Sequence, residues 1–345
     1  MTLLQRLGIS HAIIQAPMAG TSTPAMAAAV SNAGAFGFLG LGSSNAVSAA
    51  TQIAETKKLT ARPFGVNLFC HQPPAPDPAS DKAWIEYLRP EFAKYGATPP
   101  AQLTEIYKSF VTDDAMFELV LRERPVVVSY HFGLPPAEKI ATFKKAGIVQ
   151  MATATCLLEA RHIQDAGIDA IVAQGYEAGG HRGMFDPAAQ DNRLGMFSLV
   201  QVLVRAMNIP VIAAGGIMDG AGINAVLKIG AAGAQLGTAF VGCPESAADA
   251  GYRKALSSDA AHRTVMTAAI SGRPARCLAN EFTLLDDRNH AAYPRAYDAG
   301  KALNAAAKAK GETGYGAQWA GQAAPLARSM PAAELVATLV REMKN

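Results

Sequence analysis

The stretch IPVIAAGGIMDGAGINAVLKIGAAGAQLGTAF, residues 209–240, holds the pattern that decides the fold. An apolar run at 209–216 ends in two glycines, a helical pattern follows, and a second apolar run at 231–240 contains the next glycine turn. Parallel strands joined by a helix produce this order, and glycines allow backbone N–H groups to approach a phosphate closely. The stretch therefore predicts a βαβ unit with a phosphate site at its strand ends.

The same alternation extends back toward the N-terminus. Six more strand-like runs, most of them followed by a helical pattern, lie at residues 12–16, 35–40, 64–69, 125–133, 148–154 and 168–175. Eight such units favour a closed (β/α)8 TIM barrel, in which the loops after strands 7 and 8 commonly bind phosphate. A doubly wound open sheet is the competing α/β fold, but residues 16–24 lack the G-x-G-x-x-G signature of its phosphate loop. We therefore predict the barrel.

Two segments fall outside this alternation. Residues 73–123 begin with prolines, which do not fit a strand or helix interior, and continue with helical patterns, so we expect a mainly helical insertion. Residues 245–324 also read as helical and loop-rich, and 331–345 as a terminal helix. The expected organisation is a barrel made of residues 1–244 and 325–345, with 245–324 as a helical lobe over its mouth that contributes to the substrate pocket.

Composition narrows the class of protein. Of the 345 residues, 50% are hydrophobic and 17% charged, and the net charge of +3 gives no reason to expect nucleic acid. No uncharged apolar run reaches about 18 residues, so we expect no membrane span, and the first ten residues do not resemble a signal peptide. The four cysteines form no C-x-x-C pair, which favours reduced thiols in the cytoplasm. We expect a cytoplasmic monomer or homodimer.

The segment VAQGYEAGGHRGMF, residues 172–185, follows the sixth strand-like run and contains four glycines and His181. A histidine near its unperturbed pKa of about 6.5 can act as a base or, when protonated, hold an anion. Hydrogen bonding to its own loop is the structural alternative for His181, and His131 is equally open between the two roles. Glu177 and Arg182 are expected to order the loop. We expect the remaining histidines to be structural or on the surface: His11, His71, His162, His262 and His290. No metal-ligand spacing such as H-E-x-x-H occurs.

Other polar side chains stand at predicted strand ends or in the lobe. The amides of Asn67 and Gln174 each end a strand-like run and can both donate and accept hydrogen bonds. In YPRAYDAGK, Tyr293, Tyr297 and Lys301 are spaced four apart, which predicts one helical face. This face either packs inside the lobe or forms a phenol-and-ammonium roof over an anionic substrate, and Tyr107 is a weaker candidate of the same kind.

Taken together, the motifs resemble those of the nitronate monooxygenases, formerly called 2-nitropropane dioxygenases, and within them class I. The resemblance rests on QAPMAGTSTPAMAAAVSNAGAFGFLG (15–40), GVNLFCH (65–71), VVSYHFGLP (127–135), VAQGYEAGGHRGMF, AAGGIMDG (213–220), GAQLGTAF (233–240) and YPRAYDAGKAL (293–303). These motifs occur in the family's order and cover most of residues 12–240.

The resemblance implies an FMN-dependent barrel enzyme that oxidises alkyl nitronates, such as propionate 3-nitronate, with O2 to a carbonyl compound and nitrite, without NAD(P)H or metal. It implies that His181 is the catalytic residue, removing the α-proton of a neutral nitroalkane or acting as an electrostatic partner of a nitronate. The implied FMN contacts are Pro17, Met18, Asn67, Gln174, Gly179, Gly180, Gly215, Gly216, Gln235, Leu236, Gly237 and Thr238. Of these, Gly216, Gly237 and Thr238 would take the phosphate, in agreement with the glycine pattern.

Two other functions are compatible with the same residues. The first is an FMN-dependent reductase of this fold that takes hydride from NAD(P)H and reduces a quinone or an enoyl thioester. The second is a flavin-free barrel that binds a phosphorylated metabolite.

Overall fold

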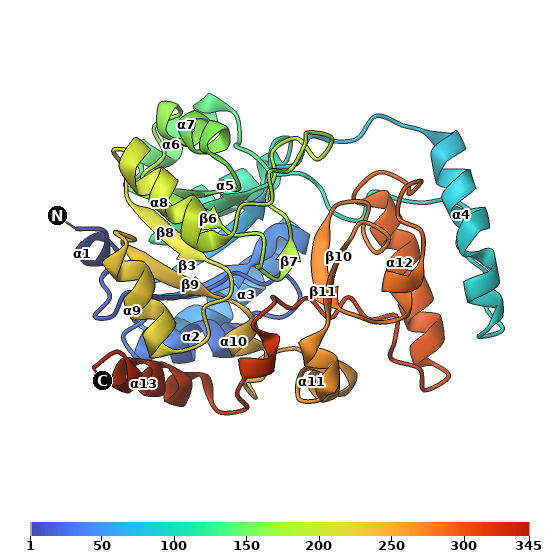
Figure 1. The fold of residues 1–345 in the computed structure, drawn as a ribbon. Coiled ribbons are helices and arrows are strands. Elements are labelled where there is room, and N and C mark those ends of the chain that lie inside the picture. The colour runs from blue at the N-terminus through green and yellow to red at the C-terminus, as the bar shows by residue number, and fades with distance from the viewer. Residues whose placement is uncertain (1, 345) are drawn as a thin grey trace.

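The computed structural model describes residues 2–344, and its main body is a TIM barrel (Figure 1). The eight strands pair in parallel in the order β1-β9-β8-β6-β5-β4-β3-β2, and a parallel bridge between Ile14 and Phe36 joins the two ends of this sheet. The strands are β1 (Ile13–Gln15), β2 (Gly37–Gly40), β3 (Phe64–Phe69), β4 (Val127–His131), β5 (Val149–Ala154), β6 (Ala170–Gln174), β8 (Val211–Ala214) and β9 (Gly233–Leu236). Each lies within one of the eight predicted runs, so the prediction of a barrel is confirmed.

Helices cover the outside of the barrel, and side chains fill its interior. The barrel helices are α2 (Pro24–Asn32), α3 (Ala46–Leu59), α5 (Asp114–Glu123), α6 (Ala137–Lys145), α7 (Leu157–Asp165), α8 (Met196–Ala206), α9 (Gly220–Lys228) and α13 (Ala332–Glu342), with the short α1 (Leu3–Leu7) and α10 (Thr238–Val241). Inside, Phe38, Met151 and Ile212 form one apolar cluster, which Leu3 and Leu7 of α1 join. Burial on both faces explains why the strands read as continuous apolar runs.

Polar residues fix where several of these helices begin. The Thr23 side chain accepts a hydrogen bond from the Met26 N–H, and Pro24 occupies the first turn of α2. The side chain of Asn45 begins α3 in the same way, and that of Asp219 begins α9. Capping oxygens satisfy N–H groups that have no partner inside the helix. The helix starts therefore follow from local sequence.

Residues 245–324 contain helices and also a small antiparallel sheet that their sequence pattern did not indicate. The helices are α11 (Ala250–Leu256) and α12 (Arg295–Lys308), with the 3-10 turns η2 (Asp259–His262) and η3 (Glu281–Leu284). The 3-10 turn η4 (Ala324–Leu326) begins at the end of this segment, and η1 (Leu41–Ser43) belongs to the barrel. The sheet has the order β10 (Thr264–Thr267), β11 (Ala275–Leu278), β7 (Gly180–His181). Because β7 comes from the loop after β6, no local periodicity could reveal this pairing.

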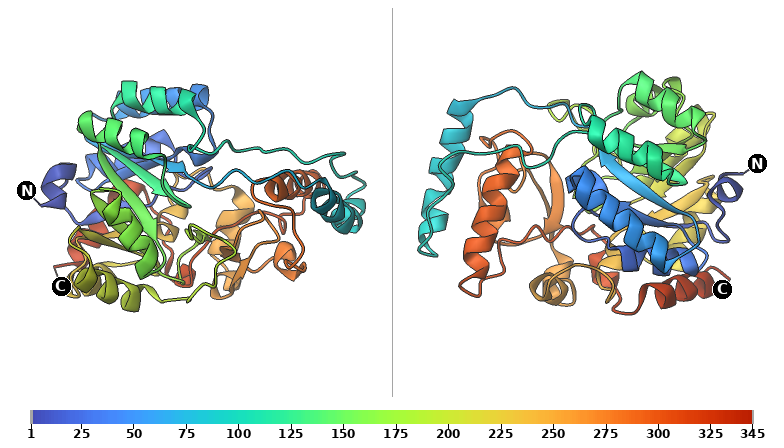
Figure 2. Two further views of the ribbon diagram at one scale, coloured as in Figure 1. Left: turned by 90° about the horizontal axis from the view of Figure 1, so that it is seen from above. Right: turned by 180° about the vertical axis from the view of Figure 1, so that it is seen from behind.

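The insertion at 73–123 divides between the two parts of the molecule. Its helix α4 (Pro78–Ala93) lies beside α12, away from the barrel (Figure 2), and Trp84 and Leu88 share an apolar cluster with Phe282 and Leu303. The second helix, α5, packs against α3 on the barrel instead. Part of the insertion therefore belongs to the core of the lobe.

None of the helices within residues 2–344 combines the length and apolar character needed to cross a membrane.

Candidate active site

A pocket lies at the carboxyl ends of the barrel strands, where the lobe meets the barrel. Most of the side chains and glycines selected from the sequence line it: Pro17, Met18, Asn67, Tyr107, His131, Gln174, Gly179, Gly180, His181, Gly215, Gly216, Gln235, Gly237, Thr238 and Tyr297. Leu236, Tyr293 and Lys301 do not line it. Leu236 is buried among the apolar residues between strands and helices, because successive side chains of a strand point to opposite faces.

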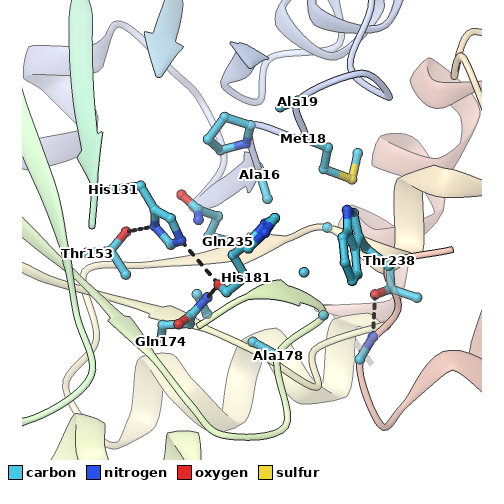
Figure 3. A pocket seen from close by; sticks show the side chains of 18 of the residues that line it. Ala16, Met18, Ala19, His131, Thr153, Gln174, Ala178, His181, Gln235 and Thr238 are labelled. Carbon is cyan, nitrogen blue, oxygen red and sulfur yellow. Dashed lines mark hydrogen bonds between the residues drawn. The ribbon is translucent and has the colours of Figure 1, made fainter. Parts of the chain in front are cut away.

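The glycine turns bring bare backbone to the pocket wall. Gly215 and Gly216 have φ values of +118° and +70°, which side chains rarely adopt, and a Cβ on Gly216 would lie 3.1 Å from Glu177 Cγ. The N–H groups of Gly215, Gly216 and Gly237 donate to no other group within residues 2–344. Thr238, next to Gly237, accepts a hydrogen bond from the N–H of Gly321 in the lobe (3.0 Å, Figure 3), which joins two parts of the pocket lining. Unpartnered N–H groups on glycine turns suit an anion such as phosphate.

The three amides at the pocket differ in what they leave for a ligand. Gln235 makes no side-chain hydrogen bond within the described chain, and Asn67 uses only its Nδ2, toward Ser129 Oγ (2.8 Å) and Ser129 O (3.2 Å). Gln174 uses both of its polar atoms within the chain, since its Nε2 donates one hydrogen bond to the His181 carbonyl (2.9 Å) and its Oε1 accepts one from the Gly183 N–H (2.8 Å). Asn67 and Gln235 therefore have the most polar capacity left for a cofactor, whereas Gln174 holds the loop and keeps one N–H and one lone pair on the pocket side of the chain's hydrogen bonds.

The loop that carries His181 is fixed from several sides. The backbone carbonyl of His181 accepts hydrogen bonds from Gln174 and from His131 Nε2 (3.1 Å), as Figure 3 shows. In β7, His181 pairs with Ala275 of β11. Arg182 is buried and donates to the Gln174 carbonyl (2.6 Å) and to Asp191. The prediction that Arg182 orders the loop is therefore confirmed.

Glu177 has the same kind of role. Its carboxylate accepts the N–H of Met196, the first residue of α8, at 2.9 Å. A carboxylate at a helix N-terminus binds N–H groups that lack a helical partner. The prediction that Glu177 orders the loop is confirmed as well.

The hydrogen bonds determine which ring nitrogen of each histidine carries the proton. His131 Nε2 faces a carbonyl, which can only accept, so His131 donates from Nε2 and accepts at Nδ1 from the Thr153 hydroxyl (3.0 Å). Ser271 Oγ lies 3.2 Å from the Arg273 carbonyl and 2.9 Å from His181 Nε2. When the Ser271 hydroxyl donates to the Arg273 carbonyl, which can only accept, its oxygen accepts from His181 Nε2–H. His181 Nδ1 is then the free lone pair.

The surroundings keep the His181 ring neutral. Burial, followed by electrostatic repulsion from His131, Arg273 and His71, lowers the pKa of His181 to about 3. Burial likewise lowers the pKa of His131 to about 4. At neutral pH the unliganded site therefore presents a neutral imidazole with an unprotonated Nδ1, and of the two roles considered for His181 the structure favours the proton acceptor.

Aromatic side chains surround His181. Its ring centroid lies 5.0 Å from Trp319, 5.5 Å from Phe132 and from Tyr293, and 6.2 Å from Tyr297. Tyr293 precedes α12, which begins at Arg295, so the predicted single helical face contains only Tyr297 and Lys301. Lys301 Nζ sits 4.8 Å from the Tyr107 ring centroid and 5.3 Å from that of Tyr297, outside the pocket lining. The ammonium group therefore packs against the two phenol rings and is not part of the pocket lining.

The comparisons with known proteins agree with this geometry. The family model described as nitronate monooxygenase matches residues 1–342. The chain belongs to the nitronate monooxygenase family. It is therefore an oxidoreductase of the monooxygenase class, and the family resemblance read from the motifs is confirmed.

Individual relatives of the nitronate monooxygenase family support the assignment along the full length. The chain is 62% identical to the nitronate monooxygenase of Paraburkholderia phytofirmans, over 99% of this chain and 95% of that protein. It is 50% identical to that of Pseudomonas aeruginosa, over 98% of each. The crystal structure of a nitroalkane oxidase from Streptomyces ansochromogenes superposes with a TM-score of 0.90 at 39% identity, covering 99% of this chain and 97% of that one.

Sequence patterns missed part of this nitronate monooxygenase pocket. Some of the missed residues stand at strand ends, such as Ser129 and Thr153, and the predicted strands could have pointed to them. Others, such as Trp319 and Gly321, come from a segment of the lobe with no regular pattern. The full set is Ala16, Ala19, Thr21, Ser43, Phe69, Ser129, Thr153, Val172, Ala178, Ala214, Ile217, Met218, Tyr252, Trp319, Gly321 and Ala323. Within residues 2–344, no group of three or more His, Cys, Asp or Glu side chains could hold a metal ion.

Proposed function

We propose that the protein uses FMN to oxidise alkyl nitronates, such as propionate 3-nitronate, with O2. Two nitronate ions and one O2 give two molecules of carbonyl compound and two nitrite ions. In each nitronate the C=N bond breaks, a C=O bond forms with one of the two oxygen atoms of O2, and nitrite leaves. One observation carries the proposal: His181, whose Nδ1 makes no hydrogen bond within the chain, lines the same pocket as the bare glycine backbone.

The residues present fit FMN. The free N–H groups of Gly215, Gly216 and Gly237 would bind its phosphate, with Thr238 beside them, and the amides of Asn67 and Gln235 would bind polar atoms of its ring. A Cβ on Gly179 would lie 2.6 Å from the Gly321 N, so the backbone there admits no side chain. When bound, FMN supplies electron-transfer chemistry that none of these side chains offers.

The electrostatics of the pocket suit a small anion. No Asp or Glu side chain is among the described residues that line it. Lys301 and Arg273 lie behind the lining, each against an aromatic ring, with Lys301 over Tyr107 and Arg273 over Phe132. A positive potential without a competing carboxylate favours an anionic nitronate.

His181 would act differently with the two substrate forms. With a neutral nitroalkane, Nδ1 would remove the α-proton, because an unprotonated imidazole is available at neutral pH. A bound nitronate would bring a negative charge that raises the pKa of His181 and favours proton uptake at Nδ1. The ring would then donate from Nδ1 to a nitro oxygen. Thr153 and Gln174 would keep it in place through His131 and the His181 carbonyl.

Two observations bear on where the protein works. Cys70, Cys156, Cys243 and Cys277 are all free thiols, and burial raises the pKa of the Cys243 and Cys277 thiols to about 12. Thiols of this kind are typical of a reducing compartment. We propose a cytoplasmic location on this basis.

The decisive experiment measures nitrite release and O2 uptake with propionate 3-nitronate, with and without NADH. We expect turnover that does not require NADH from a yellow protein with a flavin spectrum. Rapid anaerobic bleaching of the flavin by NADH would favour the reductase. A colourless protein that FMN cannot reconstitute would favour the flavin-free barrel.

A further inference from the structure

Three buried side chains next to His181 carry polar atoms without a hydrogen-bond partner. Six buried side-chain N or O atoms within residues 2–344 lack one, and four of them are His71 Nδ1, His71 Nε2, Arg273 Nε and Tyr293 Oη. We call His71, Arg273 and Tyr293 the unpartnered cluster. Buried polar atoms are nearly always hydrogen-bonded in native proteins, so this concentration indicates a bound water or ion between them.

The members of the unpartnered cluster pack around a single ring, that of Phe132. The Arg273 guanidinium carbon lies 4.3 Å from the centroid of this ring, and the Tyr293 ring 5.4 Å from it. The His71 and Tyr293 rings are 5.0 Å apart. The three side chains are only 1% (His71), 4% (Arg273) and 6% (Tyr293) exposed, and none of them lines the active-site pocket.

The charge in the unpartnered cluster has no directly paired carboxylate, since Asp186 and Glu159 act on Arg273 only from a longer range. Arg273 forms no ion pair with a carboxylate within residues 2–344, and its Nη2 donates to the carbonyls of Met184 (2.5 Å) and Phe185 (3.5 Å). Burial lowers the pKa of Arg273 to about 10, which still leaves it cationic at neutral pH. A buried, unpaired charge is costly unless an opposite charge accompanies it.

The other two members supply hydrogen-bond donors. Burial raises the pKa of Tyr293 well above its ordinary value, so its hydroxyl stays protonated. Burial and then Arg273 lower the pKa of His71 to about 4, so its ring is neutral and keeps one N–H. Together with Arg273 Nε–H, the cluster offers three donors and one positive charge. A water molecule would accept from these donors but would leave the Arg273 guanidinium without a paired anion.

We propose that the unpartnered cluster binds a small monovalent anion of halide size. The anion lies beside His181, whose ring is 5.5 Å from that of Tyr293, but outside the substrate pocket. A single positive charge selects a monovalent ion, and the tight burial of the three side chains selects a small one.

Bromide is the probe for this site. The full-length protein, as purified, is crystallised without halide and soaked in sodium bromide, and anomalous diffraction is collected at the bromine edge. We expect an anomalous peak within hydrogen-bond distance of Arg273 Nε and Tyr293 Oη. Bromide peaks elsewhere on the protein, with only water or no density at the unpartnered cluster, would overturn the proposal. Because this readout needs neither FMN nor turnover, it is independent of the proposed function.

Variants test the same site in solution through the bromide-dependent rise in Tm. Tyr293→Phe removes one donor without changing the ring, and we expect bromide to bind about tenfold more weakly, the usual effect of losing a hydrogen bond to a charged group. Tyr315→Phe is the matched control, because this tyrosine is also buried in the lobe but its hydroxyl donates to Glu91. Equal bromide affinity in wild type and Tyr293→Phe would contradict the proposal, even if Arg273 variants do not fold.

Discussion

At the scale of single residues, His181 is defined by its neighbours as much as by its own chemistry. Ser271 binds the proton on Nε2, and burial keeps the ring neutral. Hydrogen bonds from His131 and Gln174 to the His181 carbonyl hold the backbone in place. A histidine in solution would divide its proton between two nitrogens and titrate near neutral pH. Here only Nδ1 is free to react.

The first prediction concerns His181→Asn. Loss of the base should lower kcat/KM for neutral nitroethane by about 10²- to 10⁴-fold, with a smaller loss for ethylnitronate, which is already ionised. Because the pKa of His181 is lowered to about 3, the wild-type kcat/KM for nitroethane should show no inflection near pH 6.5. Steady-state rates from pH 5 to 9 test both points. An inflection near pH 6.5 that disappears in His181→Asn would contradict the neutral ring.

A second prediction concerns Ser271, which is fully buried and acts through His181 as a positioning residue. Ser271→Ala removes the hydrogen-bond acceptor of the Nε2 proton, so the ring no longer prefers the tautomer in which Nδ1 is unprotonated. We expect kcat for nitroethane to fall about tenfold, the worth of one hydrogen bond, while KM for ethylnitronate changes little. Ser271→Thr retains the hydroxyl and should restore kcat. No recovery in the threonine variant, despite normal folding, would refute this role.

At the scale of elements, the turn after β8 combines a left-handed backbone with a close contact to Glu177. In Gly216→Ala the new methyl group and the strained φ should displace the N–H groups that are proposed to bind phosphate. We expect FMN to bind at least about tenfold more weakly, measured by quenching of flavin fluorescence during reconstitution.

Gly96→Ala is the control for the Gly216 experiment. Gly96 has a similar φ of +64° but no atom within 4 Å of a Cβ, and it does not line the pocket. Each alanine should cost stability of about 1–3 kcal/mol from backbone strain. Only the Gly216 variant should lose FMN affinity, so equal FMN affinities in the two variants would rule out a phosphate role for this turn.

The elements of the barrel were predictable because their signals are local, whereas the pairing of β7 was not. The runs that form β3 and β6 are apolar because both faces of a barrel strand are buried, and glycines mark the turns after β8 and β9. By contrast, β7 has two residues and pairs with a strand about ninety positions later in the chain. Trp319 reaches the pocket from a similarly irregular segment, so sequence periodicity could not place it.

At the scale of the whole molecule, α4 and α12 give the lobe an apolar core distinct from that of the barrel. Leu88 is fully buried in this cluster, so Leu88→Ala should lower the free energy of unfolding by about 2–5 kcal/mol. The exposed Leu284, in the same part of the molecule, is the matched control and should change it by less than about 0.5 kcal/mol. Urea denaturation measures both, and equal effects would contradict the burial of Leu88 in the core of the lobe.

The pairing of β7 with β11 has a consequence for recombining this enzyme with its relatives. His181 is held by the barrel through its carbonyl and by the lobe through its pairing with Ala275 and the bond to Ser271. A chimera that exchanges residues 245–324 alone would place a foreign strand against the native histidine. Crossovers that transfer the loop at 175–195 together with the lobe keep the native pairing of β7 with β11, and we expect them to give the active hybrids.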